Sequence, residues 1–271
     1  MTREPQVSVI LTVHNGERHI HAAIESMMAQ TFDAWELIII DDGSSDQTAA
    51  IIETFANSDA RIKLVHTPGV GRAAALNMAL ERAQAPYLAN IDVDDPSHPQ
   101  RLDMLTKAME SAPLYAVIGT LSLHLVEDEQ PQWQIDPSLQ VTEIRDVTRI
   151  LTRRNPINHS SVIMRTDALR AVKGYSTNRA SVGREDYDLW VRLAQTGYRL
   201  GKLQTMLASK RLHHGQHFER SSRIPYLWGS VKVQARAITT LGNWYDWVFL
   251  PARFAYGLLP HSLRRACRGW K

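Results

Sequence analysis

Tyr87-Leu88-Ala89-Asn90-Ile91-Asp92-Val93-Asp94-Asp95 places three carboxylates within four positions, directly after a short apolar run. Crowded like charges are costly unless a cation neutralises them, and hard divalent cations such as Mg²⁺ or Mn²⁺ prefer carboxylate oxygens. The stretch therefore predicts either a metal site or a solvated acidic turn in which Asp95 caps a helix ahead of Pro96. Taken alone, these residues favour neither alternative.

Similar apolar runs precede this stretch, and each of them ends in polar residues. Continuous runs rich in β-branched residues are typical of strands buried on both faces of a sheet. With the stretch itself, they span residues 7–13, 35–40, 62–66 and 87–91, with apolar residues at helical spacing in between. Strands that alternate with helices over short connections predict an α/β fold with a mostly parallel sheet covered by helices.

Polar residues at the carboxyl ends of these strands are expected to face one crevice, because open α/β sheets bind ligands at this edge. Four loops contribute, at residues 12–16, 41–44, 67–72 and 92–95. Asp41 and Asp42 could accept hydrogen bonds from a ribose or a base. An ordinary turn, with Ser45 or Asp46 capping the next helix, would explain at least one of these two acids equally well.

The second half of the chain has a less regular pattern. It predicts strands at 115–120, 121–126 and 160–165, a polar loop at 127–137, and a helix at 187–196. No internal repeat is visible, and the 44% hydrophobic content of the 271 residues is ample for a packed core.

Five motifs taken together resemble family 2 glycosyltransferases, which are inverting enzymes with the GT-A fold. In chain order they lie at residues 7–16, 30–44, 71–77, 87–95 and 185–192. All five occur in the order and at the ordinary spacing of the family. The resemblance implies a Rossmann-like GT-A catalytic domain at 1–215, in which 1–112 bind the nucleotide sugar and 113–215 face the acceptor.

The resemblance also implies which residues would hold the nucleotide. Thr12 and Asp42 match the positions that help to hold its base and ribose, and Asp41 belongs to the same turn. Asp92 is the first acid of the Asp-x-Asp motif and would lie toward the ribose or a metal-bound water. Arg72 lies where a basic residue could meet the nucleotide, although a solvated residue at the start of a helix is a close alternative.

The metal site follows from the same motif, whose later acid is the usual ligand in the family. Asp94 would therefore bind Mg²⁺ or Mn²⁺, with Asp92 in support. His213 lies near the position of a family histidine and could ligate the metal or meet the diphosphate. A zinc site that combines His213 with His217 is the minor alternative.

Asp186 matches the catalytic base of the family. Inverting transfer requires a carboxylate that takes the proton from the acceptor hydroxyl as that oxygen attacks the anomeric carbon. A position that opens a helix suits this role, because the helix N-terminus favours the ionised form. Glu185 and Asp188 are weaker candidates, and without the resemblance Glu185 and Asp186 would be interpreted as a helix cap.

Charge is divided unevenly along the chain. Residues 1–198 carry 18 Lys and Arg against 26 Asp and Glu, whereas residues 199–271 carry 13 against 2. A basic tail on an acidic body suggests a polyanionic partner, either nucleic acid or an anionic membrane surface. Because no nucleic-acid recognition motif accompanies the tail, we expect the membrane surface and no nucleic acid.

The tail, residues 216–271, has the composition of a helical region at a membrane interface. Four apolar residues fall at helical spacing, namely Trp247, Leu250, Phe254 and Leu258. Such residues followed by arginines are typical of an amphipathic helix on anionic lipids, and residues 244–259 are too short to span a bilayer. A helix packed on the catalytic domain or on a second subunit is the alternative.

Two further features bear on the compartment. Cys267 is the single cysteine, so an internal disulfide is excluded, and residues 1–6 lack the apolar core of a signal peptide. We therefore expect a cytoplasmic protein that lies peripherally on the inner face of the cytoplasmic membrane.

The resemblance, together with these patterns, implies a metal-dependent, inverting glycosyltransferase in cell-surface polysaccharide biosynthesis. It would move a sugar from a nucleotide-diphosphate donor, preferentially a UDP-sugar, to a hydroxyl of a glycan or lipid-linked acceptor. A non-catalytic, membrane-associated module that binds sugar nucleotides or scaffolds glycan assembly is the alternative. A sugar nucleotidyltransferase would need a glycine-rich loop with a basic residue after the first strand, which residues 14–17 do not supply.

Overall fold

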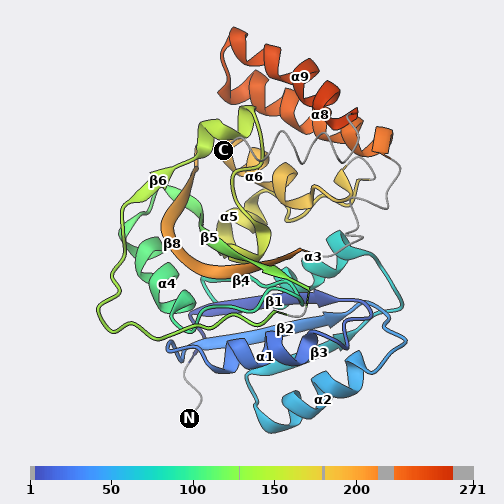
Figure 1. The fold of residues 1–271 in the computed structure, drawn as a ribbon, viewed down its shortest axis with the longest axis vertical. Helices are drawn as coiled ribbons and strands as arrows, with labels where there is room; N and C mark the ends of the chain where they lie inside the picture. Colours follow the sequence, from blue (N-terminus) through green and yellow to red (C-terminus); the bar gives the residue numbers. More distant parts are fainter. Residues whose placement is uncertain (1–3, 128, 179–180, 213–222, 259–271) are drawn as a thin grey trace.

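An eight-stranded sheet forms the centre of the protein, in the order β3-β2-β1-β4-β7-β5-β8-β6 (Figure 1). The computed structural model describes residues 4–127, 129–178, 181–212 and 223–258. The strands are β1 Val7–Val13, β2 Trp35–Asp41, β3 Ile62–His66, β4 Tyr87–Asn90, β5 Tyr115–Val126, β6 Ile144–Asp146, β7 Ile163–Arg165 and β8 Arg199–Leu212. β1 to β4 run parallel, as do β5 and β8, whereas β7 and β6 run antiparallel to their neighbours. The mostly parallel sheet predicted from the sequence is confirmed.

Helices cover both faces of the sheet (Figure 1). They are α1 Ile20–Met28, α2 Thr48–Ser58, α3 Arg72–Arg82, α4 Arg101–Ser111, α5 Thr166–Ala171, α6 Glu185–Gln195, α8 Arg223–Leu241 and α9 Phe249–Leu258, with 3₁₀ helices η1 Thr148–Thr152, η2 His159–Ser161 and η4 Trp244–Val248. Successive residues of β1 point to opposite faces. Ile10 joins the core under α3, α5 and α6, whereas Val9 and Leu11 join the core over α1, α2 and α4.

The second half differs in detail from the expectation. The two strands expected at 115–120 and 121–126 form the single strand β5, which pairs with β8 through several register shifts. The strand expected at 160–165 is shortened to β7, because 159–161 form a 3₁₀ turn. β8 was not predicted, since its polar residues interrupt the apolar pattern and only part of it is buried.

The C-terminal region is helical, as predicted. α8 packs against α6 and η1, and α9 packs back on α8 (Figure 1). Buried residues on α8 include Val233 and Ala237, which belong to the same core as Trp190 of α6. Within the described ranges, no helix is both long and apolar enough to cross a membrane.

Candidate active site at the carboxyl edge of the sheet

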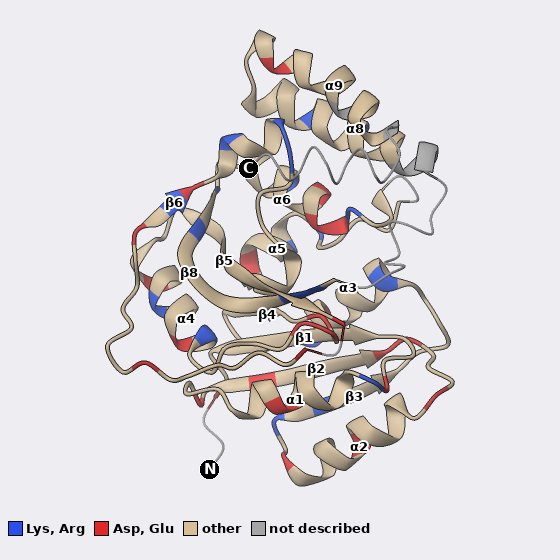
Figure 2. Cartoon of the chain, viewed as in Figure 1, with Lys and Arg blue, Asp and Glu red and all other residues tan. Residues whose placement is uncertain are grey.

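The loops after β1, β2, β3 and β4 meet at one edge of the sheet. In the parallel registers Val13 pairs with Asp41, and Asp41 pairs with His66, so that β1, β2 and β3 end side by side. β4 lies on the other side of β1 in the same direction, with Asn90 opposite Ile10, and its acidic loop follows directly. Figure 2 shows acidic residues gathered in the loops at this edge. The four loops expected from the sequence pattern are therefore brought together at one edge of the sheet.

Asp42 ties the loop after β2 to the loop after β3. Its Oδ1 accepts hydrogen bonds from the Thr67 hydroxyl at 2.5 Å and the Val70 N–H at 2.7 Å, and its Oδ2 accepts the Gly71 N–H at 2.9 Å. Gly71 has a φ of 88°, a conformation that favours glycine. Burial would raise the pKa of Asp42, but these hydrogen bonds outweigh it and hold the pKa below its ordinary value. Asp42 is therefore an ionised acceptor that holds the two loops together.

Asp41 supports the same turn from inside the protein. Its Oδ1 accepts the Ser44 N–H at 3.1 Å, and its Oδ2 lies 3.2 Å from His66 Nδ1. Thr12 is buried one residue before the end of β1, opposite Ile40 of β2. Both residues thus lie at the predicted edge, with the Asp41 oxygens turned toward the loop after β2 and the end of β3.

The loop after β4 brings three carboxylates together. Asp92, Asp94 and Asp95 offer oxygen atoms that all lie within 4.8 Å of one another. Asp92 and Asp94 are partly exposed, whereas Asp95 is buried. The accessible oxygen donors are thus those of Asp92 and Asp94, the two acids that the sequence singles out, and carboxylate oxygens are the ligands that Mg²⁺ and Mn²⁺ prefer.

Asp95 has a structural role. Its Oδ1 accepts the Arg211 N–H at 2.8 Å, and its Oδ2 accepts the Ser160 hydroxyl at 2.7 Å and Lys210 Nζ at 3.2 Å. Burial, opposed by the charge of Lys210, raises the pKa of Asp95 to about 6. The expectation that Asp95 caps the following helix is wrong, because α4 begins later, at Arg101. Asp95 instead fastens the acidic loop to β8.

Arg72 connects the acidic loop to the start of α3. Its guanidinium donates to Asp92 Oδ1 at 2.5 Å and lies 3.4 Å from Nδ1 of the buried His159. Burial would raise the pKa of Asp92, but the charges of Arg72 and Lys210 hold it well below its usual range. Burial, and then the charge of Arg72, lower the pKa of His159 to about 3. The neutral ring therefore accepts at Nδ1 and donates from Nε2 to Tyr175 Oη at 2.9 Å.

Asp186 lies in the first turn of α6, as the sequence predicts. Its Oδ2 accepts a hydrogen bond from Asn155 Nδ2 at 2.6 Å, and its Oδ1 accepts the Tyr187 N–H at 2.7 Å. Burial raises the pKa of Asp186 to about 6, with these hydrogen bonds and the charge of Arg72 opposing the shift. The interaction with Arg72 places Asp186 within electrostatic range of the acidic loop.

Glu185 and Asp188, the other two acids of the 185–192 motif, have hydrogen-bond or ion-pair partners of their own. Glu185 accepts a backbone hydrogen bond within the preceding loop. Asp188 is buried and forms ion pairs with Arg192 and Arg236, each at 2.7 Å. Residues two apart on a helix lie about 200° apart around its axis, so Asp186 and Asp188 point to opposite sides of α6.

Sequence reasoning did not assign several side chains that hold this edge together. They are Thr67, Asn155, Tyr175 and Lys210. Thr67 had a usable signal, because it follows β3 directly at the predicted edge. Asn155 and Lys210 had none, since Asn155 lies in the connection between η1 and η2, and Lys210 lies in the strand that was missed. His213, the further metal-ligand candidate, lies outside the described residues.

Comparisons with known proteins agree with this geometry. The chain matches the model of glycosyl transferase family 2 over residues 8–172. It is 36% identical over 213 residues to the putative glycosyltransferase EpsE of Bacillus subtilis. This alignment covers 78% of this chain and 74% of the relative. It is 28% identical over 212 residues to the O-antigen biosynthesis glycosyltransferase WbnJ of Escherichia coli, covering 77% and 80%.

Two solved structures share the fold. S. aureus TarS 1–349 in complex with UDP-GlcNAc aligns with a TM-score of 0.70 and 20% identity, over 93% of this chain and 72% of that chain. The mannosyltransferase PcManGT from Pyrobaculum calidifontis, in complex with GDP-Man and Mn²⁺, aligns with a TM-score of 0.66 and 20% identity, over 94% and 70%. The predicted GT-A fold is thus confirmed, and it defines the class. The chain belongs to glycosyltransferase family 2.

Proposed function

We propose that the protein is a metal-dependent, inverting glycosyltransferase that moves a sugar from a UDP-sugar to a hydroxyl of a glycan or lipid-linked acceptor. The observation that carries the proposal is the set of loops joined by Asp42 and Arg72, with Asp186 within electrostatic range on α6. A role in cell-surface polysaccharide biosynthesis belongs to the same proposal. The O-antigen function in the name of the relative WbnJ supports that role.

The donor would bind where the loops after β1, β2 and β3 meet. Thr12 and Asp42 would hold the base and ribose, while Asp41 keeps the turn in shape through its bond to Ser44. Arg72 is the first residue of α3 and donates to Asp92, a position from which its charge could meet a diphosphate. The UDP-GlcNAc complex of the structural neighbour TarS supports a UDP-sugar as the donor.

The acidic loop fits a divalent cation, since Asp92 and Asp94 offer accessible oxygens at close spacing. Asp94 would hold the cation, with Asp92 in support, and His213 remains a candidate ligand from the sequence. A bound cation neutralises the charge that develops on the departing diphosphate. The Mn²⁺ in the PcManGT complex supports this assignment. Lys210, whose Nζ lies 3.9 Å from Asp92, adds positive charge at the same place.

Asp186 would act as the general base. Its carboxylate would take the proton of the acceptor hydroxyl as that oxygen attacks the anomeric carbon, opposite the leaving diphosphate. A single attack of this kind inverts the anomeric configuration. Asn155 donates to Oδ2 and the Tyr187 N–H donates to Oδ1, so that the orientation of the carboxylate is fixed before the acceptor arrives.

The pH dependence of transfer should report the ionisation of Asp186. The base must be ionised, and its pKa is raised to about 6, so activity is lost as the pH falls through that value. At pH 5 only about a tenth of the molecules would carry the ionised base, whereas an unshifted Asp would be about nine-tenths ionised. Initial rates at saturating donor and acceptor between pH 4.5 and 8 measure this loss of activity at low pH. Full activity down to about pH 4.5 would contradict the assignment.

Replacing Asn155 by Ala should move the loss of activity at low pH to a higher pH. The Asn155 amide donates to Asp186 and lowers its pKa, so its removal leaves the burial effect less opposed and raises the pKa. We expect a shift of about half a unit to one unit in the pH profile, with little change in donor affinity. An unchanged profile would show that this hydrogen bond does not control the base.

Screening nucleotide sugars for thermal stabilisation tests the proposed function as a whole. A bound donor stabilises the folded state by mass action, so the true donor should raise the melting temperature in the presence of Mn²⁺. Asp42→Ala should lose this shift, because Asp42 holds the loops after β2 and β3 together. If UDP-, GDP-, dTDP- and CMP-sugars all leave the wild-type melting temperature unchanged, the proposal fails.

The predicted membrane surface remains part of the proposal, but its contact is the η4 turn, which includes Trp247, and not one face of a helix that continues to Leu258. The η4 turn exposes Trp244 by 82% and Val248 by 66%, and Trp247 is also exposed. Phe254, expected on the lipid face of a helix, instead stacks edge-on against Trp228. Exposed tryptophans are typical of residues that lie at a membrane interface.

Basic residues flank this turn and complement an anionic lipid surface. The Arg153 guanidinium lies over the Phe249 ring at 4.6 Å, and Arg149 lies 3.9 Å from the buried Asp246 of η4. Arginine beside aromatic side chains suits anionic headgroups above an apolar layer. We therefore assign the η4 turn as the part of the C-terminal region that would meet the membrane.

The double variant Trp244→Ala/Trp247→Ala should bind anionic vesicles at least about tenfold more weakly, since each tryptophan would lose apolar burial in the interface. Co-sedimentation with phosphatidylglycerol vesicles measures the loss. Leu114→Ala/Met206→Ala removes two exposed apolar residues elsewhere and should bind like the wild type. Equal binding of all three proteins would exclude η4 as the contact.

A further inference from the structure

Two separate segments of the chain meet at the Asp186 carboxylate. Asp186 lies in the first turn of α6, whereas Asn155, which donates to it, follows η1. Tyr187 joins the two segments a second time, because its hydroxyl donates to the Leu151 carbonyl of η1. The orientation of Asp186 therefore depends on how α6 and η1 lie relative to one another.

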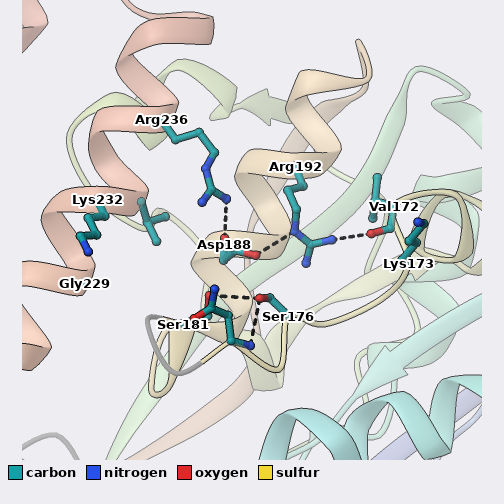
Figure 3. Close-up of a pocket in the computed structure, with 11 residues that line it drawn as sticks. Val172, Lys173, Ser176, Ser181, Asp188, Arg192, Gly229, Lys232 and Arg236 are labelled. Atoms are coloured by element: carbon teal, nitrogen blue, oxygen red, sulfur yellow. Dashed lines mark hydrogen bonds and ion pairs between the residues drawn. The ribbon is translucent and has the colours of Figure 1, made fainter.

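α8 packs on both of these segments. Figure 3 shows Arg236 of α8 directed at Asp188 of α6, to which it donates at 2.7 Å. The buried face of α8 has residues at helical spacing, namely Ser230, Val233, Gln234 and Ala237. Two of these four are polar, and burying a polar side chain is costly unless it is hydrogen-bonded.

Ser230 and Gln234 bind one segment each. The Ser230 hydroxyl accepts a hydrogen bond at 3.0 Å from Nε of Arg184, the N-cap residue of α6. The Gln234 amide donates at 2.9 Å to the carbonyl of Thr152, the last residue of η1. Because Ser230 and Gln234 lie four positions apart on one face of α8, a single helical turn holds the start of α6 and the end of η1 together.

Both of these bonds lie close in the sequence to the groups that would perform the chemistry. Arg184 lies two positions before Asp186, and Thr152 lies three positions before Asn155. A change in the position of either segment would therefore alter the hydrogen bond between Asn155 and Asp186.

Gln234 is an unusual choice for a buried position. Its Oε1 is buried and has no hydrogen-bond partner within the described part of the chain. An apolar side chain of similar size would avoid the cost of burying this oxygen. Departures from complete pairing occur mainly at functional sites, so the bond from Gln234 to Thr152 explains this residue better than packing does.

We propose that Ser230 and Gln234 are positioning residues for the general base, because they fix α6 and η1 so that Asn155 and Asp186 meet. The inference rests on the proposed function, in which Asp186 takes the proton of the acceptor hydroxyl. It adds that α8, in the C-terminal region, supports the transfer reaction itself. A displacement of about 1 Å at a reacting group can lower a rate about 100-fold, so these residues can affect transfer without contacting the substrate.

The double variant Ser230→Ala/Gln234→Met tests the inference in the full-length protein. Its transfer rate from the nucleotide sugar found by thermal screening, measured as nucleoside diphosphate released, should fall at least about tenfold. The donor dissociation constant should stay within about twofold of the wild type, because the loops that would hold the donor follow β1 to β4. The melting temperature should change little, because Met fills the volume of Gln234 and removes its unpaired oxygen. The single variants, which disturb less of the interface, should each show part of the loss in rate.

Thr240→Ala is the matched control. The Thr240 hydroxyl also joins α8 to α6, where it accepts from Gln195 at 3.0 Å, but this bond lies at the far end of α6. Gln195 lies nine positions after Asp186, which is about 14 Å along the helix axis. This variant should transfer sugar at the wild-type rate.

The same double change in an Asp186→Asn background separates positioning from other roles. Without the base there is nothing left to position, so the remaining rate should fall by less than about twofold. A loss of about tenfold in both backgrounds, or a rate for Ser230→Ala/Gln234→Met equal to that of Thr240→Ala, would overturn this inference alone. A wild-type rate for Asp186→Asn itself, or no turnover of any nucleotide sugar, would overturn the proposed function and this inference with it.

Discussion

Replacing Asp186 by Asn is expected to reduce sugar transfer about 10²–10⁴-fold, the usual contribution of a positioned general base. The amide keeps the size of the side chain but cannot accept the acceptor's proton. Donor affinity should change little, because the groups that would hold the donor belong to the loops after β1 to β4 and not to α6. Steady-state transfer rates, together with donor titration of the same variant, measure both quantities.

Asp167→Asn is a matched control for this substitution. Asp167 lies in the first turn of α5 and accepts a backbone N–H from the next residue, as Asp186 does on α6, but it is exposed and lies outside the candidate site. Its variant should transfer sugar at the wild-type rate. A rate for Asp186→Asn within a few-fold of this control would remove Asp186 from the role of base.

The second large effect is expected for Asp94→Asn. A neutral amide is a poorer ligand for a hard divalent cation than a carboxylate, so the metal would lose its main protein contact. We expect the Mn²⁺-dependent part of donor binding to disappear and transfer to fall about 100-fold or more. The measurement is the donor dissociation constant with and without Mn²⁺.

Asp103→Asn provides the control for a lost carboxylate in the same half of the chain. Asp103 lies on α4, where it pairs with Lys107 on the protein surface. Its variant should keep the wild-type dependence on Mn²⁺. Asp92→Asn should also weaken donor binding, but by less, because Arg72 would remain at the edge of the site. An Asp94→Asn protein that still needs Mn²⁺ to bind donor would contradict the metal assignment.

The first half of the fold was predictable because its strands are buried on both faces. Their apolar runs stand out in the sequence, and parallel pairing then brings the loops that follow them to one edge. Asp42 and Asp94 could be located in this way, since each follows such a run within a few residues. Asp186 could not, because it lies far along the chain and only the family resemblance indicated its role.

The remaining side chains of the site depend on long-range contacts that leave no local pattern. Lys210 contacts Asp95, which lies 115 positions away in the sequence. It does so from β8, a strand whose polar residues interrupt the apolar pattern by which strands are predicted. Asn155 meets Asp186 from a connection without a motif. The C-terminal prediction shows the same limit. The spacing of Trp247 and Phe254 suggested one helical face, whereas a 3₁₀ turn exposes the first and α8 covers part of the second.

The most direct test of the account is a crystal structure of the protein with Mn²⁺ and the donor found by screening, with anomalous data collected at the manganese edge. We predict a manganese peak beside the Asp94 carboxylate, in contact with the diphosphate, and a base and ribose against the loops that hold Thr12 and Asp42. A nucleotide bound elsewhere, or bound at this edge with no manganese near Asp92 or Asp94, would contradict the central claim.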